Sequence, residues 1–408
     1  MKEFFNVETI EGVLAHAPSF MPVGTETVPL AECLGRVLAG DIYSDVDIPD
    51  FNRSTMDGFA VKASSTFGAS EANPAYLNVR GQIRMGVRPD LAIGPGEAAR
   101  IATGGMLPDG ADSVIMVEHT DTLDDATIEA YRSVAPGQHV IEKGEDIRHT
   151  RPALTRSTRI RPQEAGLLAA CGCTEIDVFR RPRVGIISTG DEVVPVDRVP
   201  GQGQIRDINT QTLSGQVLAA GGTPMVFGIV RDNRNDLMDK CRRALERTDM
   251  VMISGGSSVG ARDFTVEVLD ALPDTAILVH GISISPGKPT ILARSGGKAF
   301  WGLPGHAVSA MVVFAVVVRP FLDRLCGLSQ TVRQFPIQAV LSRNLASAQG
   351  RVDYVRVRLV AADGHIMAEP ILGKSGLINT MVKADGLIAI GMNTEGLEKG
   401  TTVEVIPL

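Results

Sequence analysis

The fold is decided by the stretch RPRVGIISTGDEVV (residues 181–194), because a continuous apolar run ends there in a polar turn that contains glycine. Such runs are typical of strands buried on both faces of a parallel sheet. A second strand is predicted over 224–232, and a third strand with the loop that follows it over 249–263. Helices are predicted between the strands over 209–222 and 235–248. We expect Asn209 or Thr210 to cap the first of these helices and Gly221-Gly222 to end it. The alternation predicts a parallel α/β sheet with right-handed crossovers.

The segments on either side of this unit follow a different pattern. Short alternating runs such as AYLNVRGQIRMG (75–86) and DSVIMVEHTDT (112–122), separated by turn residues, predict a β-rich unit between about residues 46 and 140. RPQEAGLLAACGC (161–173) predicts a helix that serves as a spacer. Beyond Gly327, the runs FPIQAVLS, DYVRVRLV and TTVEVIPL predict a small C-terminal β-barrel or sandwich.

Composition excludes some classes of function. The formal net charge is −7, with 47 acidic and 40 basic residues, and only 4% of the 408 residues are aromatic. We therefore expect neither the positive electrostatic field that attracts nucleic acid nor the aromatic side chains on which its bases stack. The first residues show no basic segment followed by an apolar run, and the apolar stretch 307–318 falls short of the about twenty residues that span a bilayer. We expect a cytoplasmic enzyme that acts on small molecules, with no membrane contact.

Five cysteines, Cys33, Cys171, Cys173, Cys241 and Cys326, are scattered along the chain without a CxxC pair. The Cys-Gly-Cys at 171–173 suits either a soft metal or redox partner, or simply small residues that close a helix in a reducing compartment. The second interpretation is favoured.

Three segments suggest anion binding. In SGGSSVGARD (254–263), Gly255 and Gly256 expose backbone N–H groups after an apolar strand, and Ser258 adds a hydroxyl donor. Lys288 lies in a Pro-Gly-Lys-Pro turn whose two prolines limit the entropy lost on ordering it. His306 and Ser309 stand at the start of a predicted helix, where a local capping role is the alternative.

Carboxylates recur at predicted strand ends and glycine turns. Mg²⁺ prefers one or two carboxylates together with substrate phosphate and water. The set therefore predicts metal-assisted chemistry, and its members are Asp57, Asp146, Asp191, Glu192, Asp232 and Asp263.

A series of motifs, in order along nearly the whole chain, closely resembles the molybdopterin molybdenumtransferases, the MoeA and gephyrin E-domain family. The motifs are IPDFNRSTMDGFAV, IATGGMLPDGADSVIMVE, KGEDI, ISTGDEVV, IRDINTQTL, ISGGSSVGARDF, SPGKP, LPGHAVSA, RVDYVRVRL and KSGLINTMVKADGLI.

The resemblance implies an elongated α/β plus β fold of four domains. These are a linking helical and extended domain (23–45 and 141–180), an inserted β-rich domain (46–140), a MogA-like α/β molybdopterin-binding domain (1–22 and 181–328) and a C-terminal β-barrel domain (329–408).

The resemblance also implies a function. Molybdenum from molybdate is inserted into adenylated molybdopterin with Mg²⁺, which releases AMP and forms the molybdenum cofactor. It implies a homodimer whose active cleft is lined by both chains. A molybdopterin adenylyltransferase, and a molybdoenzyme or its chaperone, are the expected partners.

By position, the family's functional polar residues fall on Asp57, Thr103, Asp146, Glu192, Asp232 and Asp263. Of these, Asp57, Glu192, Asp232 and Asp263 are the expected Mg²⁺ ligands, with Ser258 beside Asp263 at the nucleotide end. The expected molybdate pocket consists of Lys288, Ser309, Arg351 and Ser375. Hydroxyl donors and a planar guanidinium suit a tetrahedral dianion.

The chain departs from the family at positions that bear on the anion. Ser285 and Gly281 stand where lysines are usual, and His306-Ala307 replaces Asn-Pro. Ser257 stands where valine is usual, and Asn52-Arg53-Ser54-Thr55 replaces Asp-Asn-Ser-Ala. Loss of a cation beside a buried dianion weakens binding by about 1–3 kcal/mol unless another residue compensates, and His306 and Arg262 are the candidates. Two alternatives follow: an insertase specialised for tungstate, and a carrier or scaffold that binds molybdopterin without turnover.

Overall fold

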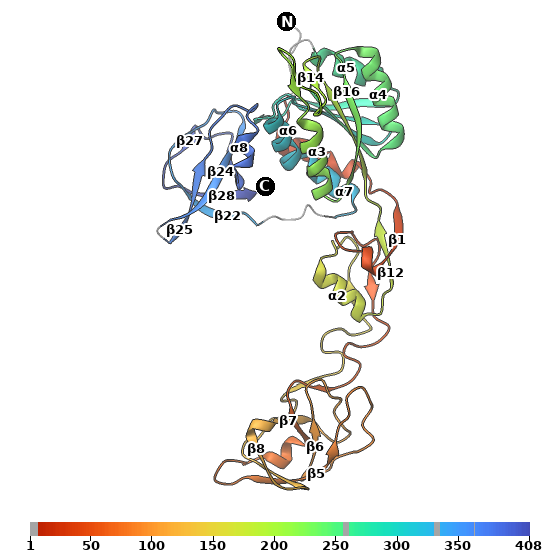
Figure 1. Ribbon diagram of the computed structural model, residues 1–408, viewed down its shortest axis with the longest axis vertical. Helices are drawn as coiled ribbons and strands as arrows, with labels where there is room; N and C mark the ends of the chain where they lie inside the picture. The colour runs from red at the N-terminus through yellow and green to blue at the C-terminus, as the bar shows by residue number, and fades with distance from the viewer. Residues whose placement is uncertain (1–6, 256–260, 330–334, 363) are drawn as a thin grey trace.

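The computed structural model describes residues 7–255, 261–329, 335–362 and 364–408, and of residues 261–263 it describes the backbone alone. The chain is elongated, with a β-rich domain at one end and an α/β domain at the other (Figure 1). A small linking domain joins these two, and a C-terminal domain lies beside the α/β domain. The predicted α/β plus β architecture is confirmed.

The α/β domain is built on a sheet of six strands. β13 (Arg183–Thr189) pairs in parallel with β16 (Thr223–Val230) on one side and with β17 (Met250–Ser254) on the other. β21 (Lys298–Leu303) continues the parallel set beyond β17. An antiparallel pair, β20 (Ile291–Ser295) and β18 (Thr275–His280), completes the order β16-β13-β17-β21-β20-β18.

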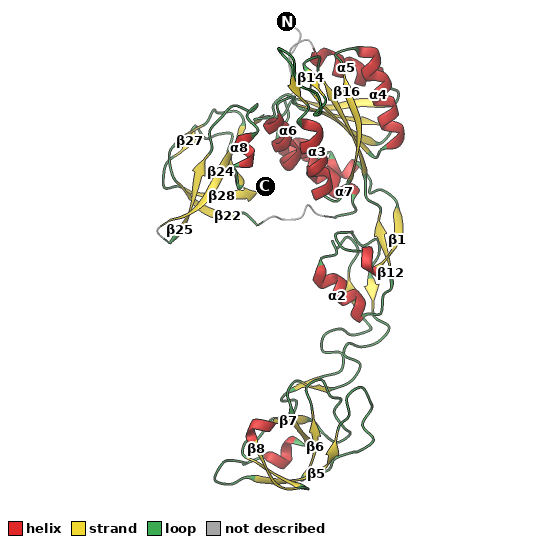
Figure 2. Ribbon diagram, viewed as in Figure 1, coloured by secondary structure: helices red, strands yellow, loops and turns green. Residues whose placement is uncertain are grey.

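Helices cover both faces of this sheet and create two apolar cores (Figure 2). The core on one face includes Trp301, whose ring meets that of Phe321 edge-on with centroids 5.0 Å apart. The helical elements of this face are α1 (Ile10–Leu14), α3 (Asn209–Ala219), α6 (Ala307–Val313), the π-helical turn η5 (Phe314–Val318) and α7 (Arg319–Leu325). The other face is covered by α4 (Arg234–Arg247) and α5 (Ala261–Ala271). The apolar stretch 307–318 is therefore a buried core segment, as its length predicts.

The start of α3 differs from the sequence prediction. The helix begins at Asn209 and its N-cap position is Ile208, so neither Asn209 nor Thr210 is the cap. Asp207, one residue before the N-cap position, caps the helix with its side chain. Its Oδ1 accepts a hydrogen bond from the backbone N–H of Thr210 at 3.0 Å. A carboxylate at this position also faces the positive end of the helix dipole.

The C-terminal domain is a closed barrel, which decides between the two predicted alternatives. Each strand pairs with the next in the cycle β24-β25-β22-β28-β26, and β26 pairs back with β24. The strands are β22 (Ile337–Leu341), β24 (Val352–Ala362), β25 (His365–Pro370), β26 (Gly386–Ile390) and β28 (Thr402–Pro407), with β23 (Leu345–Ala346) pairing with β27 (Gly396–Leu397) outside the cycle.

Backbone pairing and apolar packing both join the barrel to the α/β domain. β19 (Ile284–Ser285), which follows β18 along the chain, pairs in parallel with the start of β24. Val308 and Val312 of α6 pack against Met381 and Leu387, which come from α8 (Asn379–Val382) and β26. The seam between the two domains is therefore held by both backbone pairing and apolar contact.

The linking domain contains two antiparallel pairs and one helix. β1 (Thr25–Pro29) pairs with β12 (Glu175–Phe179), and β2 (Ile42–Tyr43) pairs with β11 (Pro152–Leu154). α2 (Pro162–Ala170) lies at the predicted helix and ends at Gly172, which has a φ of +74°. The N–H groups of Gly172 and Cys173 bond back to Ala169 and Leu168, so the Cys-Gly-Cys closes the helix as the favoured interpretation expected.

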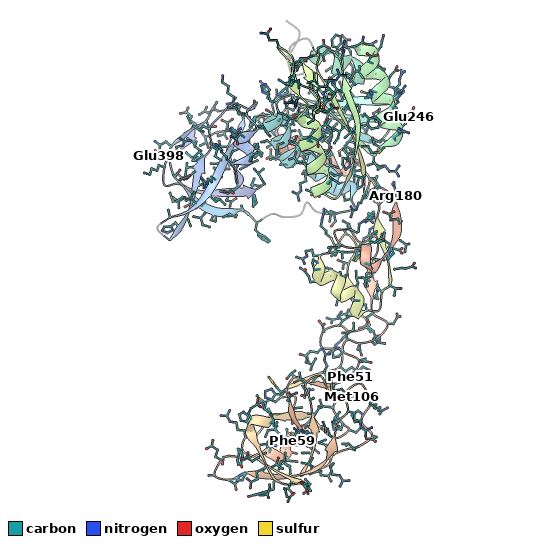
Figure 3. The ribbon with its side chains drawn as sticks, viewed as in Figure 1. Phe51, Phe59, Met106, Arg180, Glu246 and Glu398 are labelled. Carbon is teal, nitrogen blue, oxygen red and sulfur yellow. The ribbon has the colours of Figure 1, made fainter. Side chains whose placement is uncertain are left out.

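The inserted domain is a six-stranded sheet that curls around the apolar core to which Phe59 belongs. Arg180 marks the junction of the linking and α/β domains, and Phe51 and Met106 mark the end of the inserted domain that faces it (Figure 3). The sheet order is β7 (Ser113–Met116), β4 (Gly58–Val61), β6 (Glu97–Ile101), β5 (Ala75–Gln82), β9 (Thr127–Ala130) and β8 (Thr120–Asp124), while β3 (Arg53–Ser54) pairs with β10 (Val140–Ile141) at its base.

Among the described residues, no helix has the length and apolar character needed to cross a bilayer.

The packing of α3 against the sheet predicts the effect of a substitution. Leu213 is fully buried in the core of this face, whereas Leu218 of the same helix is exposed. We expect Leu213→Ala to lower the free energy of unfolding by about 2–5 kcal/mol, because a cavity adds to the lost burial. Leu218→Ala is the matched control and should stay within about 0.5 kcal/mol of the wild type in urea unfolding. Equal effects of the two substitutions would contradict the packing described here.

Candidate functional site

Three loops meet at the carboxyl edge of the sheet because β16, β13 and β17 run parallel and in step. Thr189 lies opposite Val230, and Ser188 lies opposite Ser254, so the three strands end together. The loop after β13 carries Asp191 and Glu192, the loop after β16 carries Asp232, and the loop after β17 begins at Gly255. Ligands of open α/β sheets bind at this edge.

A cleft of about 270 Å³ opens at this edge. Glu192, Asp232 and Gly255 line it from the three loops, and His306 lines it from the turn before α6. Arg206 and Asn209 contribute from the segment that leads into α3. The structure therefore brings Glu192, Asp232 and Gly255 of the predicted site together.

The electrostatics of the cleft favour a cation. Burial raises the pKa of Asp232, and the nearby charges of Asp191 and Glu192 raise it further. Asp191 Oδ1 also accepts the backbone N–H of Asp232 at 3.3 Å, which ties the two loops together. Within the described residues no group of three or more His, Cys, Asp or Glu side chains forms a metal site. Mg²⁺ needs only one or two carboxylates when substrate phosphate and water complete its shell, and the residues present fit that pattern.

Buried polar atoms without partners surround the same cleft. Thr189 Oγ1, Ser254 Oγ and Asn209 Oδ1 belong to lining residues, and none of them has a hydrogen-bond partner among the residues that the structure describes. The Asn209 amide donates from Nδ2 to the carbonyl of Gly305 at 2.8 Å, which fixes its orientation. Buried polar atoms are rarely left unpaired in proteins. Their convergence indicates a site that a polar ligand completes.

Gly255 is required by a close approach of backbones. Its φ is +118°, and a Cβ there would lie 2.1 Å from the carbonyl oxygen of Thr189. Only glycine allows β13 and the loop after β17 to come this close. Gly256 and Ser258, predicted beside it, lie outside the described residues. Asp263 is in the first turn of α5, and its side chain also lies outside them.

Asp207 was missed by the sequence analysis as a site residue. Its buried carboxylate accepts hydrogen bonds from Ser188 Oγ at 3.0 Å and from the hydroxyl and N–H of Thr210 at 2.6 and 3.0 Å. It lines the cleft and joins the end of β13 to the start of α3, so its role is to position this edge. The signal that identifies it is the aspartate three residues before a threonine in IRDINTQTL.

A second cavity, of about 290 Å³, lies at the seam between the α/β domain and the barrel. Ser375 lines it, as does Ser285 of β19, together with Asp353 and Arg356 of β24. Arg351, predicted as an anion ligand, forms an ion pair with Asp353, with its Nε 2.9 Å from Asp353 Oδ1, and the Ser285 hydroxyl also hydrogen-bonds this carboxylate. Arg356 was not predicted as a site residue, because nothing in the sequence around it indicates that this side chain is buried.

One side-chain pair separates the two cavities. His306 Nδ1 lies 2.7 Å from Ser375 Oγ, and the N–H of Val308 donates to the Ser375 carbonyl at 3.2 Å. His306 faces the carboxylate cleft, Ser375 faces the second cavity, and Gly376 faces the cleft again. Of the other predicted anion ligands, Ser309 is buried within α6 and Lys288 is exposed in the turn before β20. Neither lines either of these two cavities.

The remaining predicted residues lie elsewhere in the chain. Asp57 Oδ1 accepts the N–H and the hydroxyl of Thr103 at 2.7 and 2.9 Å, and these two bonds lower the pKa of Asp57. Both residues are exposed in the inserted domain, and Asp146 is exposed on the segment that returns from it. Within one chain, this group lies at the opposite end of the molecule from the carboxylate cleft (Figure 1).

Comparison with known protein families finds three consecutive matches. Residues 7–172 match the "MoeA N-terminal region (domain I and II)", residues 185–324 match the "Probable molybdopterin binding domain", and residues 338–408 match the "MoeA C-terminal region (domain IV)".

Individual proteins match over almost the full length. The molybdopterin molybdenumtransferase of Bacillus subtilis is 32% identical, over 94% of this chain and 89% of its own. Two crystal structures of the molybdopterin biosynthesis MoeA protein from Pyrococcus horikoshii also resemble this chain. One has a TM-score of 0.79 at 38% identity and covers 98% of this chain and 99% of its own. The other has a TM-score of 0.82 at 28% identity and covers 99% of this chain and 100% of its own.

The raised pKa of Asp232 predicts how stability depends on pH. Since its pKa in the folded protein lies above the ordinary value of 3.8, its contribution to stability is complete below that value and is lost as pH rises through the raised pKa. We therefore expect Asp232→Asn to be more stable than the wild type at pH 7, and the difference to vanish below about pH 3.8. Urea unfolding across this pH range measures it.

Asp239→Asn, an exposed acid in α4, is the control and should show no such pH-dependent gain. Mg²⁺ should reduce the difference between wild type and Asp232→Asn at pH 7, because it relieves the repulsion among the carboxylates. An Asp232→Asn variant that is less stable than the wild type at pH 7 would contradict the electrostatics of the cleft.

Proposed function

Because the chain belongs to the MoeA family and takes part in molybdenum cofactor biosynthesis, we propose that it is a molybdopterin molybdenumtransferase that inserts molybdenum from molybdate into adenylated molybdopterin. One observation carries the proposal: two neighbouring cavities, a cleft lined by Glu192 and Asp232 and a seam cavity lined by Arg356 and Asp353, meet at the His306–Ser375 pair.

The adenylate end of the substrate occupies the carboxylate cleft. Glu192 and Asp232 would hold a Mg²⁺ ion there, with Asp263 as the further ligand expected from sequence. When bound, Mg²⁺ offsets the charge of the phosphoanhydride and polarises its oxygens. Thr189, Ser254 and Asn209 supply the unpaired polar atoms that orient the nucleotide or the pterin. Asp207 keeps the edge of the sheet in place behind them.

Molybdate occupies the second cavity, beside the dithiolene of the same substrate. Ser375 offers a hydroxyl donor, and Ser285 and Arg351 are available if the anion replaces Asp353 as their partner. Lys288 and Ser309 remain proposed ligands from the sequence and would require the turn before β20 and α6 to approach the anion. His306 holds the Ser375 hydroxyl where the two cavities meet.

The overall chemistry balances without any further reactant. Cleavage of the phosphoanhydride consumes one water and releases AMP, and one oxygen of molybdate leaves as water when the two dithiolene sulfurs bind. The metal stays at the same oxidation state, so no oxidant or reductant is required.

We further propose that the protein works as a homodimer. Asp57, Thr103 and Asp146 are exposed on the inserted domain and its return segment, far from the cleft of their own chain. An elongated chain is suited to placing this group against the cleft of a second copy. A molybdopterin adenylyltransferase that supplies the adenylate, and a molybdoenzyme or chaperone that accepts the product, are the proposed partners, and the cytoplasm is the proposed location.

The function predicts AMP release that depends on molybdate. Purified protein is mixed with adenylated molybdopterin and Mg²⁺, with molybdate, tungstate or neither, and AMP is followed by chromatography. We expect release with molybdate. Release with tungstate alone would instead indicate a tungstate-specialised insertase, and tight binding without release under any condition would indicate a carrier.

Substitution of the cleft acids provides the second arm of this experiment. We expect Asp232→Asn and Asp263→Asn to slow AMP release by at least about 10- to 100-fold, the usual effect of disturbing a catalytic metal site. Asp239→Asn is again the control. Normal turnover of the adenylate by both cleft variants would overturn the assignment of these acids.

A further inference from the structure

A side chain that can carry a proton stands where the two cavities meet. His306 lines the carboxylate cleft, Ser375 lines the seam cavity, and His306 Nδ1 lies 2.7 Å from Ser375 Oγ. Within the part of the chain that the structure describes, the other ring nitrogen, Nε2, has no hydrogen-bond partner. A neutral imidazole donates from one ring nitrogen and accepts at the other, so this pair connects the two cavities by a path for protons.

Backbone contacts on both sides hold the pair in position. The buried Asn209 donates from Nδ2 to the carbonyl of Gly305 at 2.8 Å, which fixes the turn before His306. The N–H of Val308 donates to the carbonyl of Ser375 at 3.2 Å, which ties the barrel loop to the start of α6. The pair is therefore organised before a substrate binds, and such groups need little rearrangement during a reaction.

The residue type at position 306 decides what the pair can do. His306 stands where the related family usually has asparagine. An asparagine amide can hydrogen-bond a serine hydroxyl, but it does not take up and release protons near neutral pH, whereas imidazole does. A role confined to positioning Ser375 would be met by asparagine as well, so histidine adds the capacity for proton transfer.

The proposed function requires protons to move at this place. When the two dithiolene sulfurs bind molybdenum, two S–H bonds and one Mo–O bond break, while two Mo–S bonds and two O–H bonds form. The departing oxygen leaves as water, and the metal keeps its oxidation state. With the adenylate in the cleft and molybdate in the seam cavity, the dithiolene lies beside the His306–Ser375 pair.

We propose that His306 is a catalytic proton-transfer residue, which accepts the thiol protons at Nε2 and passes protons from Nδ1 through the Ser375 hydroxyl to the departing oxygen of molybdate. The inference rests on the proposed function, because that function supplies the two substrates. In each transfer Nδ1 gives its proton to Ser375 Oγ as the hydroxyl proton moves to the oxygen. His306 is exposed, so exchange with water restores the Nδ1–H form before the second thiol reacts.

Other charged groups face the pair from both cavities. In the cleft, burial and neighbouring carboxylates raise the pKa of Asp232, and in the seam cavity burial raises the pKa of Tyr354 to about 12. Because these groups are present in the wild type and in variants of His306 alike, a difference between their pH profiles reports the ring. The full set is Glu192, Arg206, Asp207 and Asp232 in the cleft, Asp353, Tyr354 and Arg356 in the seam cavity, and the exposed Lys374 beside Ser375.

Molybdate-dependent AMP release in a single turnover, followed from about pH 5 to 8 where histidines titrate, tests the inference. We expect His306→Asn to react about 100-fold more slowly, which is the low end of general acid–base catalysis because water can partly replace the ring. The wild-type rate should fall on the acid side, where a protonated ring cannot accept, and His306→Asn should lack this fall. His365→Asn, which replaces an exposed histidine of β25, is the matched control and should behave as the wild type does.

Chemical rescue separates proton transfer from positioning. Imidazole added to His306→Ala should restore AMP release in proportion to its concentration, and thermal unfolding verifies that each variant is folded. A His306→Asn variant with the wild-type rate and pH profile would overturn the role of His306, as would a folded His306→Ala that imidazole does not rescue. In both cases molybdate-dependent AMP release by the wild type would leave the proposed function intact. A wild type that releases no AMP would overturn both.

Discussion

The structure depends on the parallel, in-step pairing of β13 with β16 and β17. Because Thr189 is opposite Val230 and Ser188 is opposite Ser254, the three strands end at one edge of the sheet. The loops that follow them therefore lie side by side at this edge. Gly255 then allows the backbone after β17 to approach the Thr189 carbonyl more closely than any side chain would permit. The carboxylate cleft, its unpaired hydroxyls and the raised pKa of Asp232 all follow from this crowding.

The second determinant is the seam where the barrel meets α6. Backbone pairing of β19 with β24 and the apolar contact of Val308 and Val312 with Met381 and Leu387 bring Ser375 against His306. Glu192 and Asp232 therefore lie on one side of this pair, and the buried Arg356 lies on the other side together with Asp353. Such an arrangement suits two substrates that react with each other, since a phosphoanhydride needs a cation held by acids and a dianion needs hydrogen-bond donors and a positive charge.

The sequence predicts those features that depend on local pattern. Apolar runs ending in polar loops place the parallel strands, and the same loops place Glu192 and Asp232 at one edge, where the structure brings them together. Features that depend on tertiary packing cannot be predicted from the sequence. Arg356 is an ordinary arginine in an alternating strand until the barrel closes around it, and Asp207 gains its role only when β13 and α3 meet. For the same reason, sequence order could not show that Asp57 and Thr103 lie far from the cleft of their own chain.

The central claim is that a dianion and an adenylate occupy adjacent cavities on either side of His306 and Ser375. Molybdenum has a strong anomalous X-ray signal, so a crystal of the protein grown with molybdate locates the metal directly. We expect an anomalous peak in the cavity lined by Ser285, Ser375 and Arg356. A peak in the carboxylate cleft beside Glu192 and Asp232, with none in the second cavity, would contradict it.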